Sequence, residues 1–324
     1  MVETIYEDEH ISCAFQDGAK TDVLIITFGG MFARPGERPS VWSGHPLRKI
    51  GYPAFGFIAK AQNWYPATSI LNAVEMVKAH PYFDIPERVG YGFSMGAYAV
   101  LKYGSLLNLS RAVSLSPQFS IDRHDIVDPR FNRHFKDALN SEMRIAQGDF
   151  DGRAYLIVDP HEKRDYEHAL MIQDCLSAEI LKAPHIGHAS VNAFQSTDVL
   201  ADILSCSLGH DVDGLNKIVQ NRRIHAPHRP MNIARRLTRT HRNWAWDIFR
   251  RYRDQFPEKH LHLFLNSVSS PEILEGVIAE MKRLYPTQKG HAPFLSTYSA
   301  ILTRAGDLGL AEEMTQEASR IKTP

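Results

Sequence analysis

Short apolar runs alternate with amphipathic segments over the first two thirds of the chain. The apolar runs are rich in β-branched and aromatic residues, and they predict buried strands at residues 21–28, 53–58, 88–93, 111–115, 153–158 and 179–183. The segments between them carry apolar residues at helical spacing, which predicts helices at residues 45–50, 67–80, 95–107, 166–176 and 192–208. This alternation predicts an α/β fold with a doubly wound, mainly parallel sheet.

Three parts of this region depart from the alternation. Residues 1–20 have polar interruptions and predict one or two edge strands. Residues 31–44 contain two prolines and two glycines, so we expect a loop there. Residues 119–150 are polar and rich in His, Arg and Asp, and we expect an excursion from the sheet with one helix near residues 131–145.

The pattern changes after residue 208. No β-branched runs remain, and successive segments up to residue 321 place apolar residues at helical spacing. The sequences at 284–286 and 305–313 are typical of helix ends and turns in tetratricopeptide-like helical pairs, although no clean 34-residue period is present. We therefore expect two domains, an α/β domain at residues 1–208 and a domain of helical hairpins at residues 209–324.

One predicted strand leads directly into Gly92-Phe93-Ser94-Met95-Gly96, and a predicted helix follows at once. This is the Gly-x-Ser-x-Gly pattern in a strand–turn–helix context. A serine that attacks a carbonyl must lie on a sharp turn, where side chains two residues before and after it would collide with the neighbouring strand and helix. Glycine at both places avoids the collision. The pattern predicts that Ser94 is a nucleophile at a helix N-terminus, where N–H groups stabilise developing negative charge.

A serine hydroxyl needs a base to take its proton, and this base is usually a histidine held by a carboxylate. His188 follows the last predicted strand, and the preceding Gly187 lets the loop approach the serine. We expect His188 to be the base, with His185 as the alternative. The carboxylate is expected after the strand at 153–158, where three candidates stay open, namely Asp159, Asp165 and Glu162.

Loops that follow parallel strands meet at one edge of a sheet, so several of them are expected beside Ser94. Two N–H groups are needed to stabilise an oxyanion. We expect one from Met95 and the other from the loop after the strand at 21–28, at Gly30 or Met31. A substrate pocket is expected to be walled by Trp64, Tyr65 and Gln118, with Trp42 as a further candidate. Packing of the aromatic rings and bracing of a loop by Gln118 are the alternative interpretations.

Taken together, three motifs resemble the α/β-hydrolase superfamily, namely Phe28-Gly29-Gly30, Gly92-Phe93-Ser94-Met95-Gly96 and Gly187-His188. More narrowly, the chain is similar to a poorly characterised group of bacterial α/β-hydrolase-like proteins at Asn63-Trp64-Tyr65, Ser116-Pro117-Gln118 and Asp159-Pro160…Asp165-x-x-His168-Ala169. The resemblance covers about the first 205 residues. It implies a Ser–His–acid triad of Ser94, His188 and either Asp159 or Asp165. The usual Gly-x-x-Asp signature at the acid strand is absent, because Asp159 stands where its glycine would be.

Composition adds few constraints. Hydrophobic residues make up 44% of the 324 positions, and 37 basic residues balance 37 acidic ones, as in a globular protein with a sizeable core. No apolar run reaches the roughly 18 residues of a membrane span, and the acidic residues 1–9 are unlike a secretory signal. The cysteines Cys13, Cys175 and Cys206 are widely spaced, which disfavours a disulfide framework or a thiolate metal site. We expect a cytoplasmic protein.

The stretch from Arg222 to Arg253 is strongly basic and has Asp247 as its single acid. Aromatic residues are interleaved with the arginines. This pattern favours either an anionic partner or a solvated helix face opposite an aromatic core face. Nucleic acid is not the expected partner.

The sequence predicts a serine hydrolase that cleaves a carboxylic ester or thioester of a small-molecule or acyl substrate, without a metal or diffusible cofactor. An acyltransferase would use the same residues with a different acyl acceptor. A third possibility is a non-catalytic protein that binds an anionic partner through the basic helices.

Overall fold

The computed structural model describes residues 2–321. The chain divides into two compact units between Ala226 and Pro227. The boundary lies one helix later than the expected division at 208/209. Helix α8 (Val212–Ile224) packs on helix α7 (Thr197–Leu208) and strand β8 (Ala178–Lys182), so it contributes to the core of the first unit. Leu215 and Val219 are its fully buried contacts.

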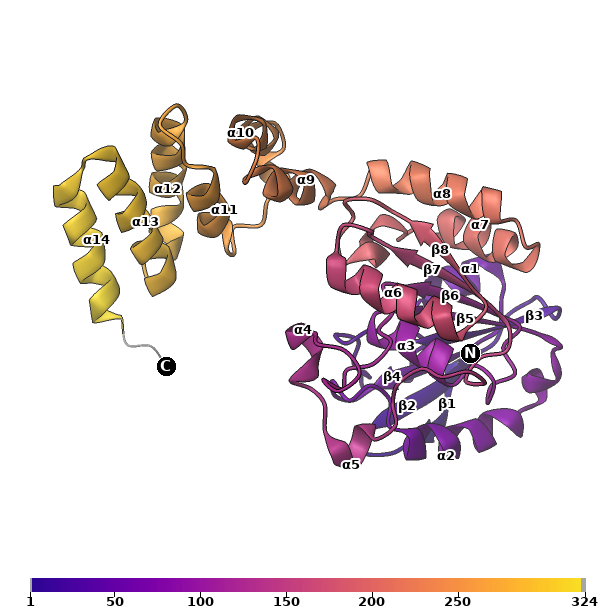
Figure 1. Ribbon diagram of the computed structural model, residues 1–324. Coiled ribbons are helices and arrows are strands. Elements are labelled where there is room, and N and C mark those ends of the chain that lie inside the picture. Colours follow the sequence, from indigo (N-terminus) through magenta and orange to yellow (C-terminus); the bar gives the residue numbers. More distant parts are fainter. Residues whose placement is uncertain (1, 322–324) are drawn as a thin grey trace. The chain divides into compact units, whose positions relative to one another are not determined.

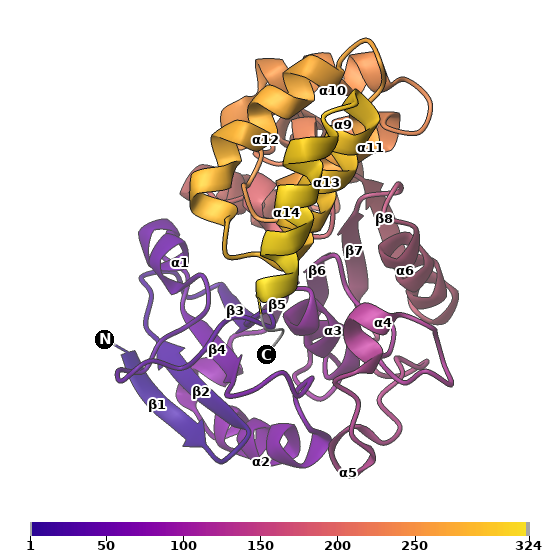
Figure 2. The same cartoon turned by 90° about the vertical axis from the view of Figure 1, so that its left-hand side faces the viewer.

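The first unit is built on an eight-stranded sheet with the order β1-β2-β4-β3-β5-β6-β7-β8 (Figure 2). Strands β3 to β8 run parallel, whereas β2 is antiparallel to β1 and to β4. The strands that precede β8 are β1 (Val2–Glu7), β2 (Ile11–Gln16), β3 (Val23–Phe28), β4 (Ala54–Ala59), β5 (Glu87–Phe93), β6 (Arg111–Leu115) and β7 (Arg153–Val158). The predicted doubly wound, mainly parallel sheet is confirmed. Residues 1–20 supply one edge strand, β1, and its neighbour β2, which is paired on both sides.

Helices cover both faces of this sheet (Figure 1). One apolar core joins it to α2 (Ala67–Lys78), α3 (Met95–Lys102) and α6 (Lys163–Cys175). A second core on the opposite face joins it to α1 (Gly44–Ile50), α7 and α8. Every residue of β3 and of β4 is buried, because both faces are covered, and this explains their continuous apolar sequences.

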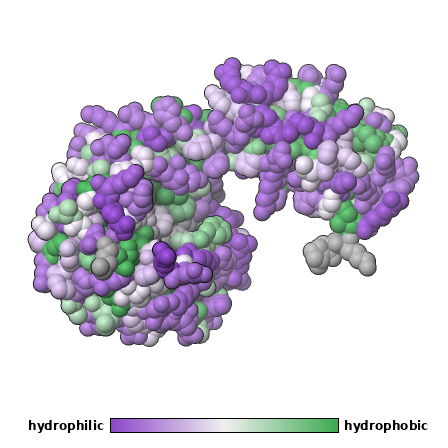
Figure 3. Space-filling model, turned by 180° about the vertical axis from the view of Figure 1, so that it is seen from behind, coloured by the Kyte–Doolittle hydropathy of each residue, from purple (hydrophilic) through white to green (hydrophobic). Residues whose placement is uncertain are grey.

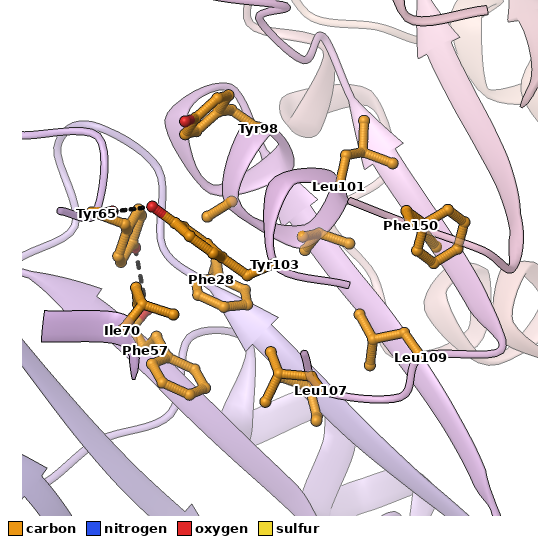
Figure 4. Packing of buried hydrophobic residues seen from close by; sticks show 14 of the residues in the cluster. Phe28, Phe57, Tyr65, Ile70, Tyr98, Leu101, Tyr103, Leu107, Leu109 and Phe150 are labelled. Atoms are coloured by element: carbon orange, nitrogen blue, oxygen red, sulfur yellow. Dashed lines mark hydrogen bonds between the residues drawn. The ribbon is translucent and has the colours of Figure 1, made fainter. Parts of the chain in front are cut away.

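Tyrosine hydroxyls connect this core to the loop that follows β3 (Figure 4). Tyr65 is fully buried, and its hydroxyl lies 2.6 Å from the Gly29 carbonyl and 3.1 Å from that of Phe57. Tyr103 donates to the Tyr65 carbonyl at 2.6 Å. These bonds fix the loop after β3 with respect to α3.

The polar excursion at residues 119–150 does not contain the single long helix that we expected. It has two short helices instead, α4 (Pro129–Asn132) and α5 (Asp137–Asn140). The Asn132 side chain accepts from Asp128 N and donates to the carbonyls of Ile121 and Ile126, while Asn140 accepts from Lys136 N. These side chains satisfy backbone groups that a longer helix would have used, so they end the helical turns early.

The second unit is entirely helical over its described residues. Its helices are α9 (Arg229–Leu237), α10 (Arg242–Arg251), α11 (Leu261–Val268), α12 (Leu274–Gln288), α13 (Ala292–Ala305) and α14 (Leu308–Arg320). They share an apolar core of their own, and α13 packs closely along α14. The helical character is as predicted, whereas the tetratricopeptide-like nature of the pairs stays a prediction.

The basic stretch from Arg222 to Arg253 falls on α8, α9, α10 and the turn that follows. Trp246 is buried in the helical core, and Trp244 is 62% exposed and stacks on His241. Arg253 pairs with Glu280 in the same unit, so part of the basic charge is balanced internally. An anionic partner for the remaining arginines stays a prediction.

Hydrophilic residues cover most of the surface visible in Figure 3, with apolar residues in scattered patches. Over residues 2–321, no helix is both long and apolar enough to cross a membrane.

Candidate active site

Ser94 occupies a strained turn between β5 and α3. Its backbone has φ 53° and ψ −120°, a conformation that residues other than glycine rarely adopt. The flanking glycines are required by contact. A Cβ on Gly96 would lie 2.1 Å from the Phe28 carbonyl oxygen, and one on Gly92 would lie 2.5 Å from the Gly96 carbonyl oxygen. The sharp turn predicted around Ser94 is therefore present, with the hydroxyl at the N-terminus of α3.

Three side chains form a hydrogen-bonded chain at the carboxyl edge of the sheet. The Ser94 Oγ lies 3.0 Å from His188 Nε2, and His188 Nδ1 lies 2.7 Å from Asp165 Oδ2. A carboxylate only accepts, so Nδ1 carries the proton and Nε2 is left to accept from the serine hydroxyl. Asp165 lies in the first turn of α6 and is almost fully buried. This arrangement can remove the serine proton as the hydroxyl attacks.

Asp159 is one of the two other carboxylates that the sequence left open, and it does not reach His188. It follows β7 directly, and its two oxygens accept from the backbone amides of His161 and Gly187 at 2.9 and 2.8 Å. Asp159 therefore shapes the loop that carries His188. His185, the alternative base, stacks on His161 with a ring separation of 4.3 Å, whereas His188 is the histidine that contacts Ser94.

A second carboxylate network holds the outer oxygen of Asp165. Arg130, in α4 of the polar excursion, donates to Asp165 Oδ1 at 2.7 Å and to both oxygens of Asp128. Asp128 is fully buried and is also approached by Arg164 at 3.2 Å and by His168 Nε2 at 3.4 Å. Arg130 therefore joins the excursion to the carboxylate that supports His188.

The charges of this network set the ionisation of both carboxylates. Burial alone would raise the pKa of Asp165, but the charges and hydrogen bonds of His188 and Arg130 bring that pKa below its ordinary value of 3.8. The pKa of Asp128 is likewise lowered, because hydrogen bonds from His168 and Arg130 outweigh its burial. Both groups are ionised in the folded protein at neutral pH.

Replacement of Asp128 by asparagine is expected to weaken the fold in a pH-dependent way. The pKa of Asp128 is lower in the folded than in the unfolded chain, so its ionisation stabilises the fold above about pH 4, and this contribution fades as the pH falls further. Asp128→Asn should lower the free energy of unfolding by about 1–3 kcal/mol at pH 7. Thermal unfolding from pH 7 to pH 3 should show the difference from wild type shrinking with acid. Asp137→Asn, at an exposed carboxylate of the same excursion, serves as the control, and a difference independent of pH would contradict the expectation.

Gln118 and Trp64 form a buried chain of hydrogen bonds that ends at the nucleophile. Trp64 Nε1 donates to Gln118 Oε1 at 3.3 Å, and Gln118 Nε2 approaches Ser94 Oγ at 3.4 Å and the Ser116 carbonyl at 3.1 Å. Both side chains are almost fully buried, and so is Tyr65 in the core. In this structure they support the site from within, and their role as pocket walls stays a prediction.

The loop after β3 lies against the nucleophile turn. A Cβ on Gly30 would lie 3.0 Å from the Phe93 ring and 3.2 Å from the Phe93 carbonyl oxygen, so glycine permits the close approach. Met95 is the first residue of α3 and directly follows Ser94. Gly30 and Met95 are thus placed beside the serine turn, and Met31 follows Gly30 in the chain, while the roles of all three as oxyanion donors stay a prediction.

Arg130 and Asp128 are the site residues that sequence reasoning missed. They lie in the polar excursion, far from any recognisable motif, and nothing in their immediate sequence marks them. Asp165 and His168 are spaced to lie one turn apart on α6, and this spacing is the one signal that could have pointed to further polar contacts around the carboxylate.

The strand order, the antiparallel β2, the serine turn after β5 and the histidine loop after β8 define the α/β-hydrolase fold in the first unit. No family model matches the sequence, and no curated protein matches it. Solved structures with a similar fold include Est1E from Butyrivibrio proteoclasticus, at 14% identity and a TM-score of 0.45 over 64% of this chain and 99% of that one.

Two further solved structures are similar at the same level. Alpha/beta hydrolase domain-containing protein 10 from mouse is 12% identical, with a TM-score of 0.43 over 66% of this chain and 99% of that one. The capsule O-acetyltransferase of Neisseria meningitidis serogroup A is 11% identical, with a TM-score of 0.42 over 62% of this chain and 93% of that one. At these identities the similarities concern the fold alone.

Proposed function

We propose that the first unit is a serine hydrolase that cleaves a carboxylic ester or thioester through an acyl-enzyme. The observation that supports this proposal most directly is the chain of hydrogen bonds from Ser94 through His188 to Asp165. A serine with its proton directed at an imidazole, and an imidazole held by a buried carboxylate, form the arrangement that activates a hydroxyl for attack on a carbonyl.

In the first half-reaction, Ser94 Oγ bonds to the acyl carbon while His188 Nε2 takes the hydroxyl proton. The carbonyl oxygen becomes negative, and N–H groups of Met95 and of the loop at Gly30 and Met31 stabilise it. The bond from the acyl carbon to the leaving oxygen or sulfur then breaks, and His188 gives its proton to the departing alcohol or thiol. Arg130 keeps Asp165 ionised and fixed, so that Asp165 can stabilise the imidazolium.

In the second half-reaction, water attacks the acyl carbon and gives a proton to His188. The bond from the acyl carbon to Ser94 Oγ breaks, His188 returns the proton to the serine, and a carboxylic acid leaves. An acyltransferase would replace water with another hydroxyl at this step. Identification of the product formed in the presence of an added alcohol separates the two outcomes.

A fluorophosphonate probe tests the proposal, because such probes react with activated serines. We expect a single adduct by intact mass, located by peptide mapping on the segment that contains Ser94, together with hydrolysis of a p-nitrophenyl ester. The absence of an adduct on the folded full-length protein, or an adduct confined to another residue, would contradict the proposal.

A further inference from the structure

A hollow of about 580 Å³ lies in the first unit, on the face of the sheet that α1 and α7 cover. Aromatic and aliphatic side chains dominate its walls. Trp42 and Tyr91 stack with their ring centres 5.1 Å apart, and Phe194 and Leu200 also line the hollow. This volume is in the range of small-molecule binding sites.

The walls of the hollow carry almost no charge. Among its lining residues, all of them described, there is no carboxylate, lysine or arginine, and His45 is its one imidazole. An anionic or cationic group would enter without a partner and would lose its hydration, which is costly. The hollow therefore favours an uncharged, apolar group.

The hollow is lined by residues that neighbour the proposed catalytic groups in the chain. Gly30 and Met31, from the loop after β3, line it together with Phe93, the residue directly before Ser94. The Phe93 ring also lies 5.6 Å from the His188 ring, between ring centres. A substrate whose carbonyl oxygen meets N–H groups at Met95 and Gly30 would have its acyl chain beside Gly30, one of the residues that line the hollow.

We infer that this hollow binds the acyl part of the substrate, and that this part is an uncharged apolar group larger than acetyl. The inference rests on the proposed function, and it adds the substrate class to it. An acetyl group offers one methyl and would leave most of the space to water, whereas a medium-length alkyl or an aryl-alkyl chain would fill it. Each further methylene buried there is expected to increase kcat/KM until the hollow is full.

A matched series of p-nitrophenyl esters tests this inference on the full-length protein. For wild type, kcat/KM should be at least about ten-fold higher for the hexanoate than for the acetate. Thr197→Trp places a large ring in the hollow from the start of α7, where Thr197 lines it and is half-buried. This variant should lose at least about ten-fold on the hexanoate and less than about three-fold on the acetate, which removes the preference.

Asp198→Trp is the matched control, because Asp198 is the next residue on α7, is exposed and does not line the hollow. It should keep the wild-type preference for the hexanoate. Equal kcat/KM for acetate and hexanoate in wild type, or a preference that survives Thr197→Trp, would overturn the inference. Fluorophosphonate labelling of Ser94 in the same samples shows whether the proposed function stands when the acyl preference fails.

Discussion

Ser94→Ala is expected to lower kcat/KM for ester hydrolysis by a factor of about 10⁴ to 10⁶, and to abolish fluorophosphonate labelling. The acyl-enzyme cannot form without the hydroxyl, so the residual rate would reflect only the polar surroundings of the site. The side chain is small, and its hydroxyl is bound by His188 and Gln118 alone among the described side chains. The variant should therefore fold as wild type does, and circular dichroism with thermal unfolding checks this.

Ser116→Ala provides a matched control for this result. Ser116 is also a buried serine at a strand end with positive φ, at 46°, but its hydroxyl pairs with Ser190 Oγ at 2.8 Å and not with a base. We expect kcat/KM to change by less than about ten-fold, since only one neutral hydrogen bond is lost. If Ser116→Ala removed activity and Ser94→Ala retained it, the assignment of the nucleophile would be wrong.

Asp165→Asn is expected to reduce kcat by about 10⁴ while the protein remains folded. The reason lies in the neighbours of the new amide. Arg130 has only donors to offer, so the amide oxygen should turn toward Arg130 and the NH₂ group toward His188. The ring would then accept at Nδ1 and carry its proton on Nε2, where it cannot take the proton of Ser94. Steady-state kinetics and the rate of fluorophosphonate labelling should fall together.

Asp159→Asn is the informative comparison, because the sequence left both Asp159 and Asp165 open as the carboxylate that supports His188. Asparagine retains one oxygen that can accept from the amide of His161 or Gly187, so one of two backbone contacts survives. We expect a loss of about 1 kcal/mol in the free energy of unfolding and about ten-fold or less in kcat. A larger loss of kcat in Asp159→Asn than in Asp165→Asn would exchange their proposed roles.

The sheet, Ser94 and His188 could be predicted because local rules determine them. Buried parallel strands require continuous apolar runs, and the turn at Ser94 requires glycines at two positions where any Cβ would lie only 2.1–2.5 Å from a backbone oxygen. His188 follows from its place after the last strand. These features depend on neighbouring residues in the sequence and on the order of the strands, and both can be recognised in the pattern of apolar residues and glycines.

The carboxylate could not be resolved from the sequence because Asp159 and Asp165 are only six residues apart. One ends a strand and the other lies in the first helical turn, and both can be reached by a loop that returns from β8. Which of them meets His188 depends on the path of residues 159–165 in space. In the structure, Asp159 binds backbone amides at the turn, and this leaves Asp165 to face the ring.

The excursion and the unit boundary were missed for a different reason. Side chains such as Asn132 and Asn140 bind backbone groups across short loops, and periodicity does not reveal such bonds. Helix α8 has the composition of the helical region, yet Leu215 and Val219 complete the core of the sheet. In both cases tertiary contacts outweigh the local pattern.

The backbone at Ser94 has a consequence for the molecule as a whole. A non-glycine residue held at φ 53° and ψ −120° costs of order 1–3 kcal/mol, a sizeable part of the 5–15 kcal/mol by which a typical domain is stable. Glycine would occupy the same turn without that cost but could attack nothing. Stability of the fold therefore favours glycine at position 94, whereas reactivity requires serine. The free energy that offsets the strain at Ser94 must come from burial of the sheet on which the turn rests.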